Sequence, residues 1–216
     1  MLNISKIYNS NNCGQFKILN YLNCNSVEIE FLDTGYKTTT RAGAIHRGKV
    51  KDKLSPIVYG VGFIGEGIEK SRANGKNTKT YTTWTDMLNR CYGNNQHIKI
   101  PTYIGCTVAP IWHNFQNFAQ WFELNYVEGY QLDKDIKIEG NKVYSPENCM
   151  FVSPKENMVK AVAKQYILTS PEGETVHVYN MSELCREKGL CQSAMSNVAN
   201  GKLKHHKQWT CDHELT

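Results

Sequence analysis

The period of the hydrophobic pattern changes along this chain of 216 residues, and that change limits the folds open to it. Residues 27–31 alternate apolar and charged side chains, which is typical of a half-buried β-strand. A helical stripe is indicated instead by four apolar residues spaced three or four positions apart, Trp84, Met87, Leu88 and Cys91. Strand-type and helix-type segments in this order favour an α+β fold built from small modules.

The order of the patterns predicts three modules. Residues 1–80 form a β-rich, basic module that ends in a glycine-rich linker. Residues 81–163 form a central core, in which two helices precede two strands and a third helix. Residues 164–216 form a hairpin followed by two short helices, and two short helices joined by a glycine-containing turn are typical of helix-turn-helix units.

Local signals place the individual elements. Strands are expected at residues 15–22, 27–31, 36–40, 131–138, 148–152, 166–169 and 175–178. Helices are expected at residues 41–46, around 84–91, from 114, from 153, at 182–188 and at 192–200. Ser153 is a suitable N-cap with Pro154 and Glu156 behind it, and Ser182 is expected to cap the helix that Gly189 ends.

Composition excludes several classes of protein. Hydrophobic residues make up 40% of the chain and charged residues 21%, as in ordinary globular proteins. The longest apolar runs fall far short of the roughly 20 residues that span a bilayer, so no membrane partner is expected. No basic stretch followed by an apolar one begins the chain, so no secretory signal is expected. None of the eight cysteines lies in a CxxC pair, and we expect reduced thiols and a cytoplasmic location.

Positive charge is concentrated in the first module. Residues 1–80 contain 12 Lys and Arg against 6 Asp and Glu, whereas the whole chain carries a net charge of +5. Such asymmetry predicts a surface that binds a polyanion, and we expect double-stranded DNA. The residues expected to contact its backbone are Lys37, Arg41, Arg47, Lys49 and Lys51.

The segment that carries the most chemistry lies between residues 132 and 157. It contains Leu132-Asp133-Lys134-Asp135-Ile136, Gly140-Asn141-Lys142, Tyr144-Ser145-Pro146-Glu147-Asn148-Cys149 and Glu156-Asn157. This series resembles the ββα-metal core of HNH nucleases from phages and group I introns. The resemblance implies that Asp133 and Asn157 hold one divalent metal, Mg²⁺ or Mn²⁺, and that Asn148 orients the general base.

The sequence departs from that family at the general base. Lys134 stands where the family has a histidine, and a lysine of ordinary pKa, about 10.4, is a poor base at neutral pH. The catalytic positions that the resemblance implies are therefore Asp133, Lys134, Asn148 and Asn157. Zinc is not expected, because Cys91, Cys106 and Cys149 with His97 or His113 match no zinc motif, and we expect these thiols to be buried.

Two further stretches resemble parts of phage endonucleases. The series Trp84-x-x-Met87-Leu88-x-Arg90-Cys91-Tyr92 is similar to a helix that precedes the core in phage HNH-type proteins. The C-terminal series Ser170-Pro171-x-Gly173, Asn180-Met181-Ser182, Gly189-Leu190, Gly201-Lys202 and Trp209 resembles nuclease-associated modular DNA-binding repeats. In such a module the second helix presents Ser193 and Asn197 to a groove of DNA. Phosphate contacts are expected from Lys202, Lys204, His206 and Lys207.

These features leave three alternative functions open. The first is a phage-type, HNH-like endonuclease, related to homing endonucleases, that binds a long DNA site and nicks or cuts it with one divalent metal. The second is a catalytically inactive DNA-binding protein, such as a repressor or blocking factor, on the same scaffold. The third is an inhibitor that binds a host enzyme, which makes a host protein the alternative partner. A phage-encoded chain would act in the cytoplasm of its host cell.

Overall fold

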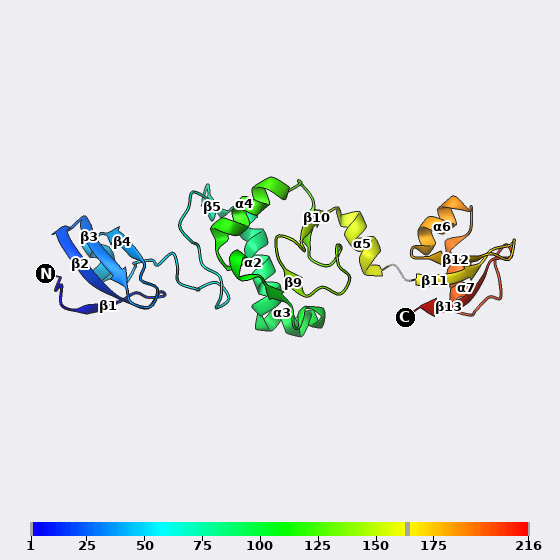
Figure 1. Cartoon of the computed structure of the whole chain (residues 1–216), viewed down its shortest axis with the longest axis horizontal. Coiled ribbons are helices and arrows are strands. Elements are labelled where there is room, and N and C mark those ends of the chain that lie inside the picture. Colours follow the sequence, from blue (N-terminus) through cyan, green and yellow to red (C-terminus); the bar gives the residue numbers. More distant parts are fainter. Residues whose placement is uncertain (1, 163–164, 216) are drawn as a thin grey trace. The chain divides into compact units, whose positions relative to one another are not determined.

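The computed structural model describes residues 2–162 and 165–215. The chain divides into two compact units, one of Met1–Glu128 with Leu132–Phe151 and one of Gly129–Gln131 with Val152–Thr216. Helices and several small sheets occur together, which confirms the α+β expectation (Figure 1). Within the described residues, no helix has the length and apolar character needed to cross a membrane.

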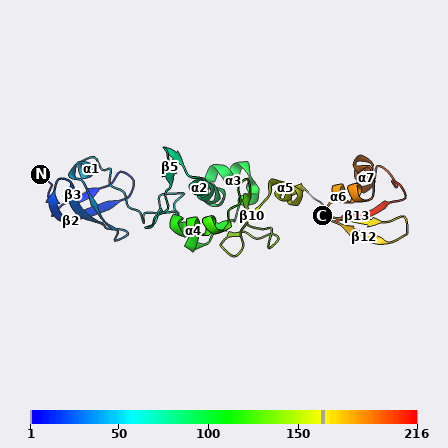
Figure 2. The same ribbon diagram turned by 90° about the horizontal axis from the view of Figure 1, so that it is seen from above.

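The first unit begins with an antiparallel sheet of four strands in chain order. These are β1 (Ile7–Asn9), β2 (Gln15–Asn23), β3 (Ser26–Phe31) and β4 (Lys37–Thr40). Along β3, Val27, Ile29 and Phe31 are buried while the intervening glutamates face outward, as the period of two predicts. The short helix α1 (Ala42–His46) lies against this sheet and adds Ile45 to the same core (Figure 2).

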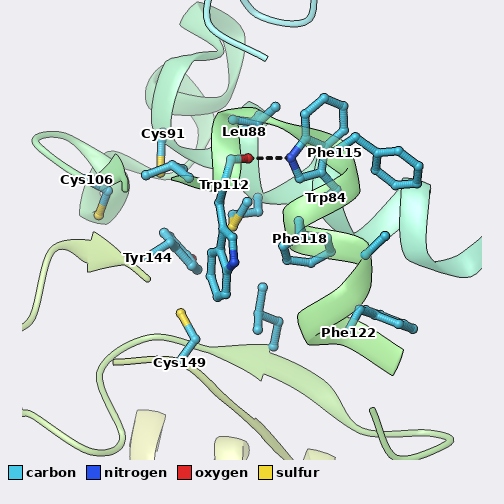
Figure 3. Packing of buried hydrophobic residues seen from close by; sticks show 14 of the residues in the cluster. Trp84, Leu88, Cys91, Cys106, Trp112, Phe115, Phe118, Phe122, Tyr144 and Cys149 are labelled. Carbon is cyan, nitrogen blue, oxygen red and sulfur yellow. Dashed lines mark hydrogen bonds between the residues drawn. The ribbon is translucent and has the colours of Figure 1, made fainter. Parts of the chain in front are cut away.

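The larger core of the first unit lies between helices α2 (Lys79–Tyr92) and α4 (Phe115–Asn125). The stripe predicted for α2 is fully buried, which confirms it as core. Figure 3 shows the aromatic side chains that meet there, and the Trp84 indole donates a hydrogen bond of 2.7 Å to the carbonyl oxygen of Trp112. That bond satisfies the one polar atom of a large buried side chain.

The glycine-rich segment that precedes α2 lies against this core. Phe63 forms a bridge with Asn114, the N-cap of α4, and a Cβ added to Gly62 would lie 2.5–2.9 Å from Leu88 and Trp84. The buried amide of Gln116 donates to two carbonyl oxygens of the segment and accepts from the Glu69 amide. Glycine is therefore used here for close approach of the backbone to the core.

Shorter elements surround the two helices. They are β5 (Arg72–Ala73), β6 (Lys76–Asn77), α3 (Asn94–Lys99), η1 (Pro101–Tyr103), β7 (Thr107–Val108), η2 (Pro110–His113) and β9 (Val143–Tyr144). β7 and β9 pair in parallel, and β8 (Gln131–Asp133) pairs with β10 (Met150–Val152). The strand predicted at 131–138 was therefore too long. It ends at Asp133 because the carboxylate there accepts hydrogen bonds from the next amides and turns the chain.

The second unit contains α5 and a small α+β module. Ser153 and Glu156 exchange the reciprocal hydrogen bonds of a capping box at the start of α5 (Pro154–Val162), which confirms the predicted N-cap. The module consists of β11 (Gln165–Thr169), β12 (Thr175–Val178), α6 (Met181–Glu187), α7 (Gln192–Ala199) and β13 (Thr210–Leu215). The order of its sheet is β12-β11-β13.

Two details of this module differ from the sequence-based expectation. Strand β13 was not predicted, because its sequence is mostly polar and its pairing with β11 is long-range. The prediction that Ser182 caps α6 was wrong, since α6 begins at Met181 with Asn180 as the N-cap. The Ser182 hydroxyl instead accepts a hydrogen bond from the Gln192 side chain at 2.7 Å and so joins the two helices.

Candidate nucleic-acid interface and central loop

The most cationic surface of the first unit is the basic segment, defined as residues 41–53. Burial alternates along its second half, where Gly48, Val50 and Asp52 are buried and the lysines between them are exposed. The exposed cations of the basic segment are Arg41, Arg47, Lys49, Lys51 and Lys53. All of them therefore direct their charge into solvent.

Hydrogen bonds to the loops that connect the first four strands fix the backbone of the basic segment. The Ser10 hydroxyl donates to the Val50 carbonyl at 2.7 Å, and the Asn11 amide donates to the Gly48 carbonyl at 2.9 Å. Asp52, the one acid of the segment, is only 4% exposed and accepts from the Thr34 hydroxyl and the Leu54 amide. Its charge is thus directed inward, away from the exposed cations.

Lysines of the sheet behave differently from those of the basic segment. Lys17 lies 2.8 Å from Glu30, and Lys37 lies 3.7 Å from the other oxygen of the same carboxylate. These two cations lower the pKa of Glu30, chiefly through its hydrogen bond with Lys17. In the described part of the chain, no cation of the basic segment forms an ion pair within 4 Å. Lys37, expected at the DNA surface, therefore already shares its charge with Glu30.

In the second unit, the predicted groove-reading residues lie on α7. Ser193 is exposed and Asn197 is partly exposed, and the Asn197 carbonyl accepts from the amides of Lys202 and Leu203 just beyond the helix. Lys202 and Lys204 are exposed. The structure thus gathers one polar helix face and two cations within one module.

Two residues expected on phosphates take part in internal bonds of that module. The Nε2 atom of His206 accepts a hydrogen bond of 3.2 Å from the Cys191 amide. The Lys207 ammonium donates to the Gly189 carbonyl at 2.8 Å, where the chain turns between α6 and α7. Both residues therefore fix the turn between the helices, whatever further contact they make.

The central loop, defined as residues 134–142 between β8 and β9, contains Lys134, and the other predicted site residues of the first unit flank it. Asp133 precedes it, and one oxygen of its carboxylate accepts from the amides of Asp135 and Ile136 at 3.0 and 2.6 Å. Asn148 follows it, and its side-chain amide donates to the Asn141 side-chain oxygen at 3.4 Å and to the Val143 carbonyl at 3.5 Å.

Lys134 is buried beneath this loop, with 8% of its surface exposed. Its ammonium donates to the Asn141 carbonyl at 2.8 Å and to the Asp135 carboxylate at 3.2 Å, and it lies 5.9 Å from the centre of the Tyr144 ring. An ammonium has three donors and no acceptor. The Lys134 ammonium thus already donates to two acceptors of the protein and lies near the Tyr144 ring.

Asn141 connects Lys134 and Asn148, although the resemblance to HNH nucleases assigns it no catalytic role. Its side chain donates to the Lys134 and Val143 carbonyls at 2.6 and 2.8 Å and accepts from the Val143 amide at 3.1 Å. Together with the Asn148 contact, this brings Lys134, Asn141 and Asn148 into one hydrogen-bonded group. The asparagine beside Gly140 was the signal in the sequence, because Asn side chains often replace backbone partners in loops.

Buried groups surround Lys134 on the side of the core. Burial raises the pKa of the Cys149 thiol to about 12 and that of the Cys91 thiol to about 12. Burial also raises the pKa of Tyr144, whose hydroxyl is hydrogen-bonded to Arg90. These thiols are therefore protonated at neutral pH, as expected of core cysteines.

A divalent metal would be held by Asp133 and Asn157 if the chain followed the HNH pattern. In the first unit, Asp133 has one oxygen engaged by two amides and is followed directly by the buried Lys134 ammonium. In the second unit, the Asn157 amide donates to the Gln131 side chain at 2.7 Å. No cluster of three His, Cys, Asp or Glu side chains suited to a metal ion occurs among the described residues. The two residues implied as metal ligands thus both have hydrogen-bond partners within the protein.

Comparisons with known proteins give one distant similarity. No protein-family model and no curated protein matches the chain. A solved structure described as DNA binding and cleavage by the HNH homing endonuclease I-HmuI matches with 23% sequence identity and a TM-score of 0.23. The match covers 42% of this chain and 61% of the I-HmuI chain, so it spans less than two thirds of that neighbour.

Proposed function

We propose that this protein binds double-stranded DNA and does not cut it. The observation that carries the proposal is the basic segment, whose five exposed cations have no acidic partner within 4 Å among the described residues. Cations that neutralise phosphates release the counterions condensed on DNA, and this release supplies most of the affinity of non-specific binding. A backbone fixed by hydrogen bonds holds the cations for this purpose before DNA arrives.

The second unit provides a separate surface that we propose also contacts DNA. Phosphate contacts orient a protein on DNA, whereas contacts to base edges select the sequence. On α7, Ser193 and Asn197 have side chains suited to base edges, and Lys202 and Lys204 have side chains suited to phosphates. We assign sequence selection to α7 and general affinity to the basic segment.

The absence of cleavage in this proposal rests on Lys134. A general base must accept a proton from the attacking water, and an ammonium that donates to two protein acceptors has no lone pair to offer. Metal-dependent cleavage, the first function expected from the sequence, would need a general base other than Lys134. Repression or blocking of a DNA site therefore agrees better with this geometry.

One experiment separates these functions. The full chain is incubated with supercoiled plasmid and with a library of short duplexes, in Mg²⁺, in Mn²⁺ and in EDTA, beside the Asp133→Ala variant. We expect a gel shift that is equal in metal and in EDTA, with no nicked plasmid. Nicking that requires metal and disappears in Asp133→Ala would show an endonuclease, and the absence of any shift would remove DNA as the partner.

A further inference from the structure

Lys134 is the only buried lysine or arginine in the part of the chain that the structure describes. A charged group taken out of water is costly unless it is paired and hydrogen-bonded. Here the Asp135 carboxylate and the Asn141 carbonyl provide both kinds of partner, at 3.2 and 2.8 Å. The burial of this ammonium is therefore compensated by the central loop itself.

The same contacts close the central loop. Residues 134–142 form no helix or strand, so backbone ladders do not hold them. Instead the Lys134 ammonium binds the Asn141 carbonyl, and the Asn141 side chain binds the Lys134 carbonyl at 2.6 Å. This reciprocal pair joins the two ends of the loop across seven positions. A loop without helix or strand whose acceptors bind one central cation is organised like a metal-binding loop.

In loops rich in carboxylates, a divalent cation usually supplies the positive charge that lets acids and carbonyl oxygens converge. Two acids stand at the start of the central loop, Asp133 just before it and Asp135 within it, and the Asn141 carbonyl oxygen lies near its end. We propose that the Lys134 ammonium takes the place of such a cation, and that the loop folds without a metal. This inference concerns the loop alone and stands whether or not the chain binds DNA.

The test measures thermal unfolding of the full chain without DNA, in EDTA and in 1 mM Mn²⁺. A metal present at a hundredfold excess over its dissociation constant would raise Tm by several degrees. We expect wild-type Tm to be the same in both solutions. The Lys134→Met variant keeps an unbranched side chain, shorter only by the terminal nitrogen, and removes its charge, and we expect its Tm to fall by about 5 °C or more in EDTA.

Replacement of one cation by another gives the decisive measurement. If the ammonium acts through its charge, Mn²⁺ will restore part of the Tm that Lys134→Met loses. The control is Lys137→Met in the same loop, because Lys137 also donates to a backbone carbonyl, that of Glu147, but is exposed. Its Tm should change little and should not respond to Mn²⁺.

Two outcomes would overturn the inference. A wild-type Tm that rises in Mn²⁺ would show that the native protein binds a metal despite Lys134. A Lys134→Met variant that folds and shows no response to Mn²⁺ would reduce the role of Lys134 to hydrogen bonding. If that variant does not fold, the wild-type comparison still decides whether Mn²⁺ stabilises the native protein.

Discussion

The basic segment makes a quantitative prediction about the salt dependence of DNA binding. Replacing both Lys49 and Lys51 with alanine removes two exposed cations that lack acidic partners among the described residues. Each phosphate neutralised contributes about −0.9 to the slope of log K against log salt. The five cations of the segment therefore contribute about −4.5, and the double variant should reduce the steepness of the slope by about 1.8.

The assay is fluorescence anisotropy of a labelled duplex between 50 and 200 mM salt. A difference of about 1.8 in slope means that, over this fourfold range, the wild type loses about tenfold more affinity than the variant does. The fold should not interfere, because both side chains are exposed and surface substitutions usually change stability by less than about 0.5 kcal/mol.

The matched control removes the same number of charges from the sheet. The Lys17→Ala, Lys37→Ala double variant also loses two lysines, so it has the same net charge as the test variant. Unlike Lys49 and Lys51, both of these lysines pair with an acid, Glu30. We expect its slope to stay close to that of the wild type. Equal reductions in the two double variants would show that only net charge matters. An unchanged slope in Lys49→Ala, Lys51→Ala would refute the assignment of the basic segment to phosphate contact.

Three further predictions concern other parts of the chain. Asn197→Ala should weaken binding to a selected site by about 1–3 kcal/mol and leave non-specific binding unchanged, as competition with unrelated duplex would show. Gly62→Ala should destabilise the first unit by about 1–3 kcal/mol in urea unfolding, because a Cβ there would lie 2.9 Å from Trp84. In alkylation mapped by mass spectrometry at pH 7.5, Cys191 should react before Cys149, since hydrogen bonding from Ser193 lowers the pKa of Cys191 and burial raises that of Cys149 to about 12.

Hydrophobic periodicity predicted the elements in which one segment alone shows which side faces the core. Strand β3 and the buried stripe of α2 agree with their patterns, because each pattern reports which side of one element faces the core. The capping box of Ser153 and Glu156 was also predictable, since both partners lie within four residues. Strand β13 was missed because its partner β11 lies about 40 residues away and periodicity contains no information about pairing.

The candidate site was harder to predict because its contacts depend on how irregular backbone folds. The pattern placed a strand through residue 138, but the Asp133 carboxylate accepts two backbone hydrogen bonds and ends the strand. That turn brings Lys134 under the loop and toward Asn141. Neither the burial of Lys134 nor the role of Asn141 follows from residue types alone.

The lysines of this chain show why residue type does not decide function. In the basic segment, Lys49 and Lys51 alternate with buried residues on a fixed backbone, so their ammonium groups face solvent and are available to phosphates. In the central loop, the turn after Asp133 directs Lys134 inward, where a carbonyl and a carboxylate bind it. The first arrangement favours association with a polyanion, whereas the second uses a cation to hold an irregular loop. A basic residue at a catalytic position is therefore an argument for catalysis only when its nitrogen can reach the reacting atoms.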